Sequence, residues 1–328
     1  MRAIYVQTND ASDNAVVVFA RDDEGGLRQA GTYTTGGKGS GEPHLPSQGS
    51  VVAEGGHLFV VNAGSDDVSV FALDGDEPRL MGRFPSGGAA PRSIAVHGDL
   101  VYVLNTAEPN VAGFRFADGA LEALGSPRPA GTDPAQVAFS PDGGTLVVTD
   151  RADTIHLYPI DSEGRVGAPV SEPSSGATPY GFAFAGDTLV VTEAARAEIG
   201  AASASSYRLT GGRLEPVSRA VGDSHSEVCW AAIAGRFAYV TNFGDGTISS
   251  YAVGDDGTLS LAAATAAATA EGEKGIRDEA ATADGEFLYA LDADARRVFG
   301  WRVGEDGSLE PVGSSDGLPA TAAGLAAV

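Results

Sequence analysis

The segment Tyr-Val-Thr-Asn at residues 239–242 decides the fold, because its pattern recurs along the whole chain. Each copy is an apolar run that ends in Asn, Asp or Glu. The other copies are Tyr-Val-Gln-Thr-Asn (5–9), Phe-Val-Val-Asn (59–62), Tyr-Val-Leu-Asn (102–105), Val-Val-Thr-Asp (147–150), Val-Val-Thr-Glu (190–193) and Tyr-Ala-Leu-Asp (289–292). The seven starts lie 54, 43, 45, 43, 49 and 50 residues apart. Periods of this length, rich in β-branched and aromatic residues and cut by Gly-rich turns, are typical of four-stranded blades rather than helical repeats.

Each repeat has the same order of strands and turns. In one copy a strand at 135–140 leads through a turn at 141–143 to the apolar run at 146–150, then to a third strand at 155–160 and a turn at 161–164. A short outer strand follows. Tight turns rich in Pro, Asp and Gly predict antiparallel neighbours within one sheet. The sequence therefore predicts an all-β fold, a seven-bladed β-propeller with four-stranded antiparallel blades.

The two ends of the chain supply complementary parts of one repeat. The chain begins at a second strand, and residues 320–328 match a first strand. Their pairing would close the ring and remove two free sheet edges. We therefore expect a single propeller domain over residues 1–328, rather than an open sandwich or two domains. The alanine-rich segment 261–270 is helix-permissive in composition, but its place in the repeat predicts an outer strand and the loop after it.

Composition limits the classes of partner. The formal net charge of −23 argues against nucleic acid and against an anionic membrane, because both would be repelled. The chain opens on a strand-like segment without a basic and apolar leader, and it has no apolar run long enough to cross a bilayer. We expect a cytoplasmic protein, and a monomer, since a propeller closes its own edges. The lone cysteine, Cys229 beside Trp230, is expected to be a buried small hydrophobe.

Short segments occur in a fixed order along the chain and carry a resemblance. They include Ser47-Gln48-Gly49, Ser86-Gly87-Gly88 with Pro91, the run 134–143, Thr-Pro-Tyr-Gly-Phe-Ala-Phe (178–184), Cys229-Trp230, the run 238–242 and Gly-Leu-Pro (317–319). In this order they resemble the lactonase-type propeller family, which includes 6-phosphogluconolactonase-like proteins and carboxymuconate-lactonizing enzymes. The resemblance covers essentially the whole chain. It implies an enzyme that acts on a lactone or a related small anionic ester.

No usual catalytic or cofactor-binding signature occurs, such as Gly-x-Ser-x-Gly, His-Glu-x-x-His, Cys-x-x-Cys, a P-loop or Gly-x-Gly-x-x-Gly. We therefore expect no cofactor. Asp66, Asp67 and Asp245 lie in predicted loops, where exposed Asp is common, and they form no spaced ligand set, so no metal is expected.

A site must therefore be assembled from separate repeats. The short turns share one face of the predicted ring, so the longer loops, above all 36–46 and 194–205, share the other. The first strand of each repeat lines the central channel, and side chains near its start converge at that second face. The predicted ring of side chains is His44, Gln48, Arg92, Ser93, Gln136, Tyr180, His225, Glu227, Lys274, Arg277 and Asp278.

Residue chemistry assigns roles within this ring. Arginine offers a planar fork suited to carboxylate or phosphate, so the ring predicts a small anionic or lactone-type substrate. His225 and Glu227 are two residues apart at the start of a strand, where alternate side chains share a face, so Glu227 is expected to orient the imidazole. The predicted catalytic residues are His225, Glu227, Arg277 and His44. The predicted substrate-binding residues are Arg92, Gln48, Gln136, Tyr180, Lys274 and Asp278.

The sequence around the predicted site differs in two places from the sequence that is usual in the family it resembles. The stretch before Cys229 is usually small and neutral but here reads Ser-His-Ser-Glu-Val (224–228), and the loop before Gln48 carries Glu-Pro-His-Leu-Pro (42–46). The remaining histidines, His57, His97 and His156, are interpreted as structural.

Three functions stay open from the sequence. The first is lactone hydrolysis, with His225 as base for water and Arg92 or Arg277 stabilising the oxyanion. The second is an intramolecular addition or elimination of the carboxymuconate type, in which His225, His44 or Glu227 moves a proton at carbon. The third is a non-catalytic propeller that binds a ligand or a protein.

Overall fold

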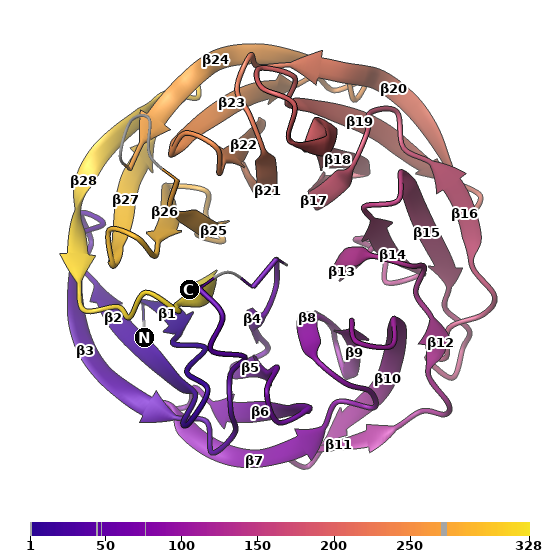
Figure 1. Ribbon diagram of the computed structural model, residues 1–328, viewed down its shortest axis with the longest axis vertical. Helices are drawn as coiled ribbons and strands as arrows, with labels where there is room; N and C mark the ends of the chain where they lie inside the picture. The colour runs from indigo at the N-terminus through magenta and orange to yellow at the C-terminus, as the bar shows by residue number, and fades with distance from the viewer. Residues whose placement is uncertain (1, 44, 47, 76, 270–273) are drawn as a thin grey trace.

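The computed structural model describes residues 2–43, 45, 46, 48–75, 77–269 and 274–328. Its strands form seven antiparallel sheets around one axis, and the colour of Figure 1 follows them in sequence around the ring. Six sheets have four strands, and the seventh carries one additional short strand. The prediction of a seven-bladed β-propeller is therefore confirmed.

We number the blades in chain order and give their strands from the axis outward. Blade 1 holds β29 (Ala323–Ala327), β1 (Ala3–Gln7), β2 (Ala15–Arg21) and β3 (Leu27–Thr34). Blade 2 holds β4 (Val51–Glu54), β5 (His57–Asn62), β6 (Asp67–Ala72) and β7 (Arg79–Pro85). Blade 3 holds β8 (Pro91–His97), β9 (Leu100–Asn105), β10 (Asn110–Ala117), β11 (Ala120–Ala123) and β12 (Arg128–Pro129).

Blade 4 holds β13 (Pro134–Phe139), β14 (Thr145–Asp150), β15 (Thr154–Pro159) and β16 (Val170–Pro173). Blade 5 holds β17 (Pro179–Ala185), β18 (Thr188–Glu193), β19 (Ser203–Thr210) and β20 (Arg213–Gly222), with the 3-10 turn η1 (Ala195–Ala197) between β18 and β19. Blade 6 holds β21 (Val228–Ala234), β22 (Phe237–Asn242), β23 (Thr247–Val253) and β24 (Leu259–Ala268). Blade 7 holds β25 (Ile276–Ala281), β26 (Phe287–Asp292), β27 (Arg297–Val303) and β28 (Leu309–Asp316).

The chain ends close the ring in blade 1. The C-terminal strand β29 pairs antiparallel with β1, for example Tyr5 opposite Ala326, and it takes the innermost place of the blade (Figure 1). This confirms the predicted closure. Residues 261–268 of the alanine-rich segment lie within β24, an outermost strand, as their place in the repeat predicted, because ladder bonds to β23 outweigh helix propensity. Residue 270 lies outside the described residues.

The polar residue that ends each apolar run is a buried hydrogen-bond centre. Asn62 donates to Asp67 and Ser69. Glu193 is fully buried and accepts hydrogen bonds from Ser203 and Ser205. A buried polar group needs such partners, and in these blades it ties the loops to the sheet, which explains why the pattern recurs.

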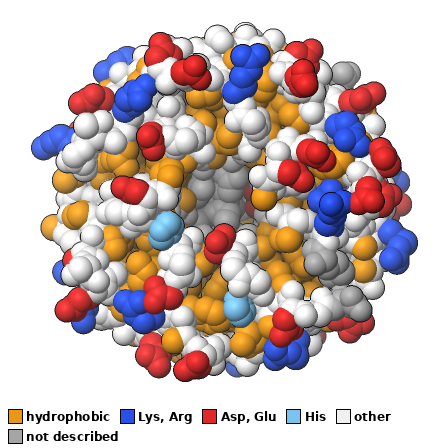
Figure 2. Space-filling model, turned by 180° about the vertical axis from the view of Figure 1, so that it is seen from behind, with side chains coloured by type: hydrophobic (Ala, Val, Ile, Leu, Met, Phe, Trp, Pro, Cys, Tyr) orange, Lys and Arg blue, Asp and Glu red, His pale blue; other side chains and the backbone are white. Residues whose placement is uncertain are grey.

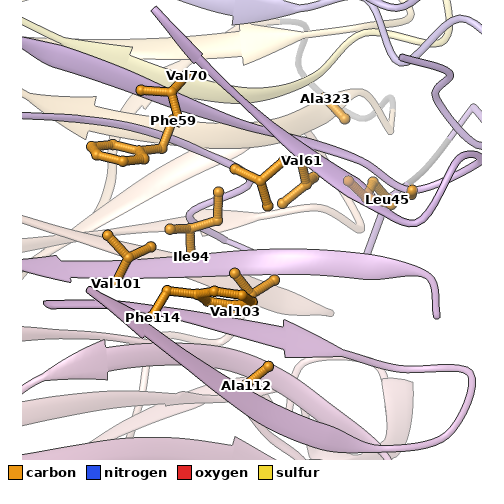
Figure 3. Close-up of a cluster of buried hydrophobic side chains, with 12 residues drawn as sticks. Leu45, Phe59, Val61, Val70, Ile94, Val101, Val103, Ala112, Phe114 and Ala323 are labelled. Atoms are coloured by element: carbon orange, nitrogen blue, oxygen red, sulfur yellow. The ribbon is translucent and has the colours of Figure 1, made fainter. Parts of the chain in front are cut away.

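Apolar side chains fill the spaces between neighbouring blades. Figure 3 shows one such cluster, with Phe59 and Val61 of blade 2 against Ile94 and Val103 of blade 3. Leu45, from the long loop before β4, joins this cluster and is only 3% exposed. Full burial of a leucine contributes about 1.5–3 kcal/mol, so this contact anchors the loop at the inner end of blade 2.

The side opposite to that of Figure 1 is hollowed at the axis. Figure 2 shows that acidic and basic side chains are distributed around its rim rather than gathered in one patch.

Candidate active site

The inner strands carry a one-residue bulge where they begin. In blades 3 to 7 the pairing of the first two strands shifts at this level, between Pro91 and Ser93 in blade 3 and between Ile276 and Asp278 in blade 7. Bulges re-aim side chains and are common next to active sites. The residues at or beside the bulges are Arg92, Ala135, Tyr180, Cys229 and Arg277, of which Arg92, Tyr180 and Arg277 belong to the predicted ring.

Two arginines lie together on one side of this ring. Arg92 is half-buried, and burial first and the positive charge of Arg151 second lower its pKa. Arg151 forms an ion pair with Asp133, donates to the Tyr180 hydroxyl at 3.3 Å and lies 5.3 Å from the centre of that ring. Among the residues that the structure describes, Arg92 has no ion pair, and its buried Nε atom and that of Arg151 have no hydrogen-bond partner. The positive charge of Arg92 is thus not matched by an ion pair among the described residues.

Two further cations lie on the other side, over Phe243. The Lys274 ammonium is 5.1 Å and the Arg277 guanidinium 4.8 Å from the centre of this ring. Lys274 forms an ion pair with Glu227, and Arg277 forms one with Asp294 at 3.1 Å. The ring quadrupole attracts a cation at such a distance, by about 0.5–1 kcal/mol at an exposed site, and this attraction helps to orient both groups.

An apolar floor connects the two pairs of cations. Tyr180 packs edge-on against Trp230, with ring centres 4.9 Å apart, and Cys229 and Phe243 join the same cluster. Burial raises the pKa of the Cys229 thiol to about 12, while Arg151, Arg277 and Lys274 act in the opposite direction. All three cations therefore lie within electrostatic reach of Cys229. Burial also raises the pKa of Tyr180, so its hydroxyl stays protonated.

The other predicted binding residues connect the blades to one another. Gln136 donates to the Phe182 carbonyl at 3.0 Å and accepts from the Phe182 N–H at 2.7 Å. Gln48 bonds both backbone groups of Ala231, across the axis. Glycine at 181 permits this approach, because a Cβ there would lie 3.0 Å from the Gln48 oxygen and 2.5 Å from the Cys229 carbonyl.

Asp278 and Ser93 also make hydrogen bonds to backbone groups of a neighbouring blade. Asp278 is 1% exposed and accepts from the N–H groups of Glu279 and Leu325, the latter in blade 1. Ser93 accepts from the Val137 N–H in blade 4. The polar atoms of Gln136 and Asp278 thus make hydrogen bonds to backbone groups of the strands, and the role of both residues in binding a substrate stays a prediction.

The expected pairing of His225 with Glu227 is wrong. His225 Nδ1 lies 2.8 Å from Asp245 Oδ2, and its Nε2 lies 3.1 Å from Thr265 Oγ1 on the outermost strand of blade 6. Glu227 instead meets Lys274. The backbone of Glu227 is left-handed, with φ of 54°, and this turn, which strand alternation does not allow for, separates the two side chains.

The other four histidines are His44, His57, His97 and His156. His44 lies outside the described residues. His57 begins β5 and His97 ends β8, both beside short turns, and His156 lies in β15 with its Nδ1 2.8 Å from Ser171 Oγ. These three lie where the repeat predicts structural residues.

Sequence reasoning missed Arg151, Phe243 and Asp294. Arg151 and Phe243 each follow directly after the buried polar residue that ends an apolar run, and Ala194 of the apolar cluster does the same. The position after that residue therefore points to the ring, and this signal was present in the repeat.

The fold and this ring define the chain as a seven-bladed propeller with cationic side chains close to the bulges where its inner strands begin. Residues 5–132 match the sequence model of a family described as "Lactonase, 7-bladed beta-propeller". Over this part of the chain the match confirms the resemblance to the lactonase-type propellers. The comparison with curated proteins gives no match.

Solved structures share the whole fold. A protein described as a proposed 6-phosphogluconolactonase of Bacteroides uniformis is 19% identical with a TM-score of 0.80, covering 100% of this chain and 99% of that one. A similarly described protein of Bacteroides fragilis is 19% identical with a TM-score of 0.77, covering 100% and 98%. The periplasmic gluconolactonase of Pseudomonas aeruginosa is 19% identical with a TM-score of 0.73, covering 100% and 99%. At these identities the similarity shows the fold.

No helix in the described part of the chain is long and apolar enough to cross a membrane. The cytoplasmic location stays a prediction.

Proposed function

We propose that the chain hydrolyses a small anionic lactone at the channel mouth. The observation that carries the proposal is the half-buried Arg92 beside Arg151, whose positive charges are not balanced by an equal number of carboxylates in direct contact among the described residues. A carboxylate or phosphate would accept hydrogen bonds from both guanidinium groups and relieve their repulsion. Relatives whose names refer to 6-phosphogluconolactone and gluconolactone support a sugar-derived lactone.

In this proposal the two pairs of cations have different tasks. Arg92 and Arg151 hold the anionic group of the substrate. Glu227 accepts a proton from water, whose oxygen attacks the ring carbonyl carbon, and Lys274 and Arg277 stabilise the oxyanion that forms. The ring C–O bond then breaks, and the proton passes to the alcohol oxygen that leaves. The arrangement of Glu227 beside Lys274 supports this assignment.

The test compares gluconolactone with its 6-phosphate in a pH-indicator assay. Glu227→Gln should lower kcat for both substrates by about 10²- to 10⁴-fold, the usual contribution of positioned acid–base groups. Arg92→Gln should raise KM for the phosphorylated lactone far more than for the neutral one. The matched control is Arg79→Gln. Arg79 is an exposed residue of β7, the outer strand of blade 2, and forms an ion pair with Asp74.

Two outcomes would reject the proposal. The first is a wild-type rate no higher than the spontaneous rate for either lactone. The second is a product without oxygen from isotope-labelled water but with solvent deuterium at carbon, which would indicate intramolecular addition or elimination instead.

A further inference from the structure

Outside the mouth, two described histidines each join a carboxylate to a hydroxyl group of an outermost strand. The repeat explains the one in blade 4. His156 pairs with Val148, two residues before the buried residue that ends β14. Ser69 and Ser249 hold the equivalent positions in blades 2 and 6. Its ring lies 3.4 Å from Asp150 and 2.8 Å from Ser171, so it ties the strand end to the outer strand. We assign this contact to blade packing.

The repeat does not explain the histidine of blade 6. His225 lies in the loop between β20 and β21, between Asp245 at 2.8 Å and Thr265 at 3.1 Å. The second oxygen of Asp245 accepts from Thr247 at 2.6 Å, which fixes the carboxylate. With Nδ1–H assigned to the carboxylate by these contacts, the lone pair of Nε2 faces the hydroxyl of Thr265.

A bulge in β24 presents Thr265 to this imidazole. The pairing of β23 with β24 shifts between Ile248 and Ser250, so residues 264–266 stand opposite Ser249 alone. The Ser249 hydroxyl donates to the Ala264 carbonyl at 2.6 Å and holds the bulge. Thr265 itself is exposed, so a reagent in solution can reach its oxygen.

A second carboxyl group, that of Asp223, fixes the backbone of His225. Asp223 is fully buried, and one of its oxygens accepts from the His225 N–H at 2.9 Å. Its other oxygen lies 2.9 Å from the Ser249 hydroxyl oxygen. Asp223 thus fixes the backbone of His225, while Asp245 holds the Nδ1 side of its imidazole. Carboxylate, imidazole and hydroxyl stand in the order that activates a nucleophile in hydrolases of unrelated folds.

We propose that Thr265 is a nucleophile at a second site, on the outer wall of blade 6, that takes acyl groups from small activated esters. The Thr265 oxygen attacks the ester carbonyl carbon while its proton passes to His225 Nε2. The bond from that carbon to the leaving oxygen breaks, and the proton moves from His225 to the leaving group. Water then attacks the carbonyl carbon of the threonyl ester and gives a proton to His225 Nε2; the bond from that carbon to the Thr265 oxygen breaks, and the proton returns from His225 to this oxygen. Asp245 is a positioning residue, because it acts through the imidazole.

The experiment uses the full-length folded protein and p-nitrophenyl acetate. We expect a burst of p-nitrophenol and an acetyl group on the peptide that contains Thr265, located by mass spectrometry. Thr265→Val and His225→Gln should lower the acetylation rate at this position by about 10²- to 10⁴-fold, and Thr265→Ser should retain it. Ser171→Ala, which removes the hydroxyl of the blade 4 contact, should leave it unchanged.

Asp245→Asn separates positioning from packing. It should slow acetylation and alter its pH profile, because the amide no longer holds Nδ1–H, at an unchanged melting temperature. Acetylation of lysines alone, or an equal rate in Thr265→Val, would overturn the proposal. Because lactone turnover at the mouth is not the readout, this result stands apart from the proposed hydrolase function.

Discussion

The half-buried guanidinium group of Arg92 lies within electrostatic reach of Arg151: burial first and this like charge second lower the pKa of Arg92. An anion between the two groups should therefore stabilise the fold. Sulfate at about 100 times its Kd would add about 2.7 kcal/mol to the free energy of unfolding. We expect a rise of a few degrees in melting temperature, relative to chloride at equal ionic strength, by differential scanning fluorimetry.

The variant Arg92→Gln should lose this response, whereas Arg79→Gln should keep it. An equal sulfate response in both variants would argue against anion binding at this pair.

Glu279 is a buried carboxyl where other blades have apolar side chains. It is 2% exposed, and neither oxygen has a hydrogen-bond partner among the described residues. The equivalent ladder positions hold Ile94, Val137, Phe182 and Ala231. Because a buried unsatisfied polar group costs about 1–3 kcal/mol, Glu279→Leu should raise the free energy of unfolding by that amount in urea titrations. Glu279→Gln, which keeps a polar group, should gain less. A destabilised leucine variant would show that Glu279 has a partner in solution.

The same residues predict how stability depends on pH. Burial raises the pKa of Asp278 to about 8, and burial and then the charge of Asp278 raise that of Glu279. The unfolded values are near about 4, so between about pH 4 and pH 8 the folded chain binds more protons than the unfolded chain. The contribution of this pair is therefore full below about pH 4 and is lost as the pH rises towards 8. Urea titrations at pH 5 and 8 should show the loss, and Glu279→Leu should reduce it; identical pH dependence in both proteins would contradict this assignment.

Gln136 should contribute to ring closure. Its amide bonds both backbone groups of Phe182 in the next blade, at 3.0 and 2.7 Å. Gln136→Ala leaves these buried groups unpaired, so we expect a loss of about 2–4 kcal/mol in the free energy of unfolding. Gln29→Ala, at an exposed position of β3, is the control and should change it by less than about 0.5 kcal/mol. A similar loss in both would remove the special role of Gln136.

Cys229 should be inert in the folded protein. Its pKa of about 12 leaves little thiolate at neutral pH, and the side chain is buried. Iodoacetamide at pH 8 should therefore leave the native chain unmodified over hours and alkylate it rapidly in concentrated guanidinium chloride, as judged by intact mass. Fast alkylation of the native protein would mean that the floor of the mouth opens.

The sequence repeat predicted more of the fold than of the candidate site. The terminal β29–β1 pair and the strand character of β24 followed from register, because each blade repeats one local pattern. Arg92, Tyr180 and Arg277 were also placed near the mouth by this register. The pairing of His225 was not, because the left-handed backbone at Glu227 breaks the alternation on which the prediction rested.

The sequence by itself determined the number of blades and the closure of the ring, since periodicity and turn chemistry act locally. Only the tertiary structure decided which polar side chains stay available to a ligand and which are used between blades. Gln136 and Asp278 make hydrogen bonds to backbone groups of a neighbouring blade, whereas Arg92 has no ion pair among the described residues. A local sequence pattern cannot predict these contacts, because they depend on the distance between two blades.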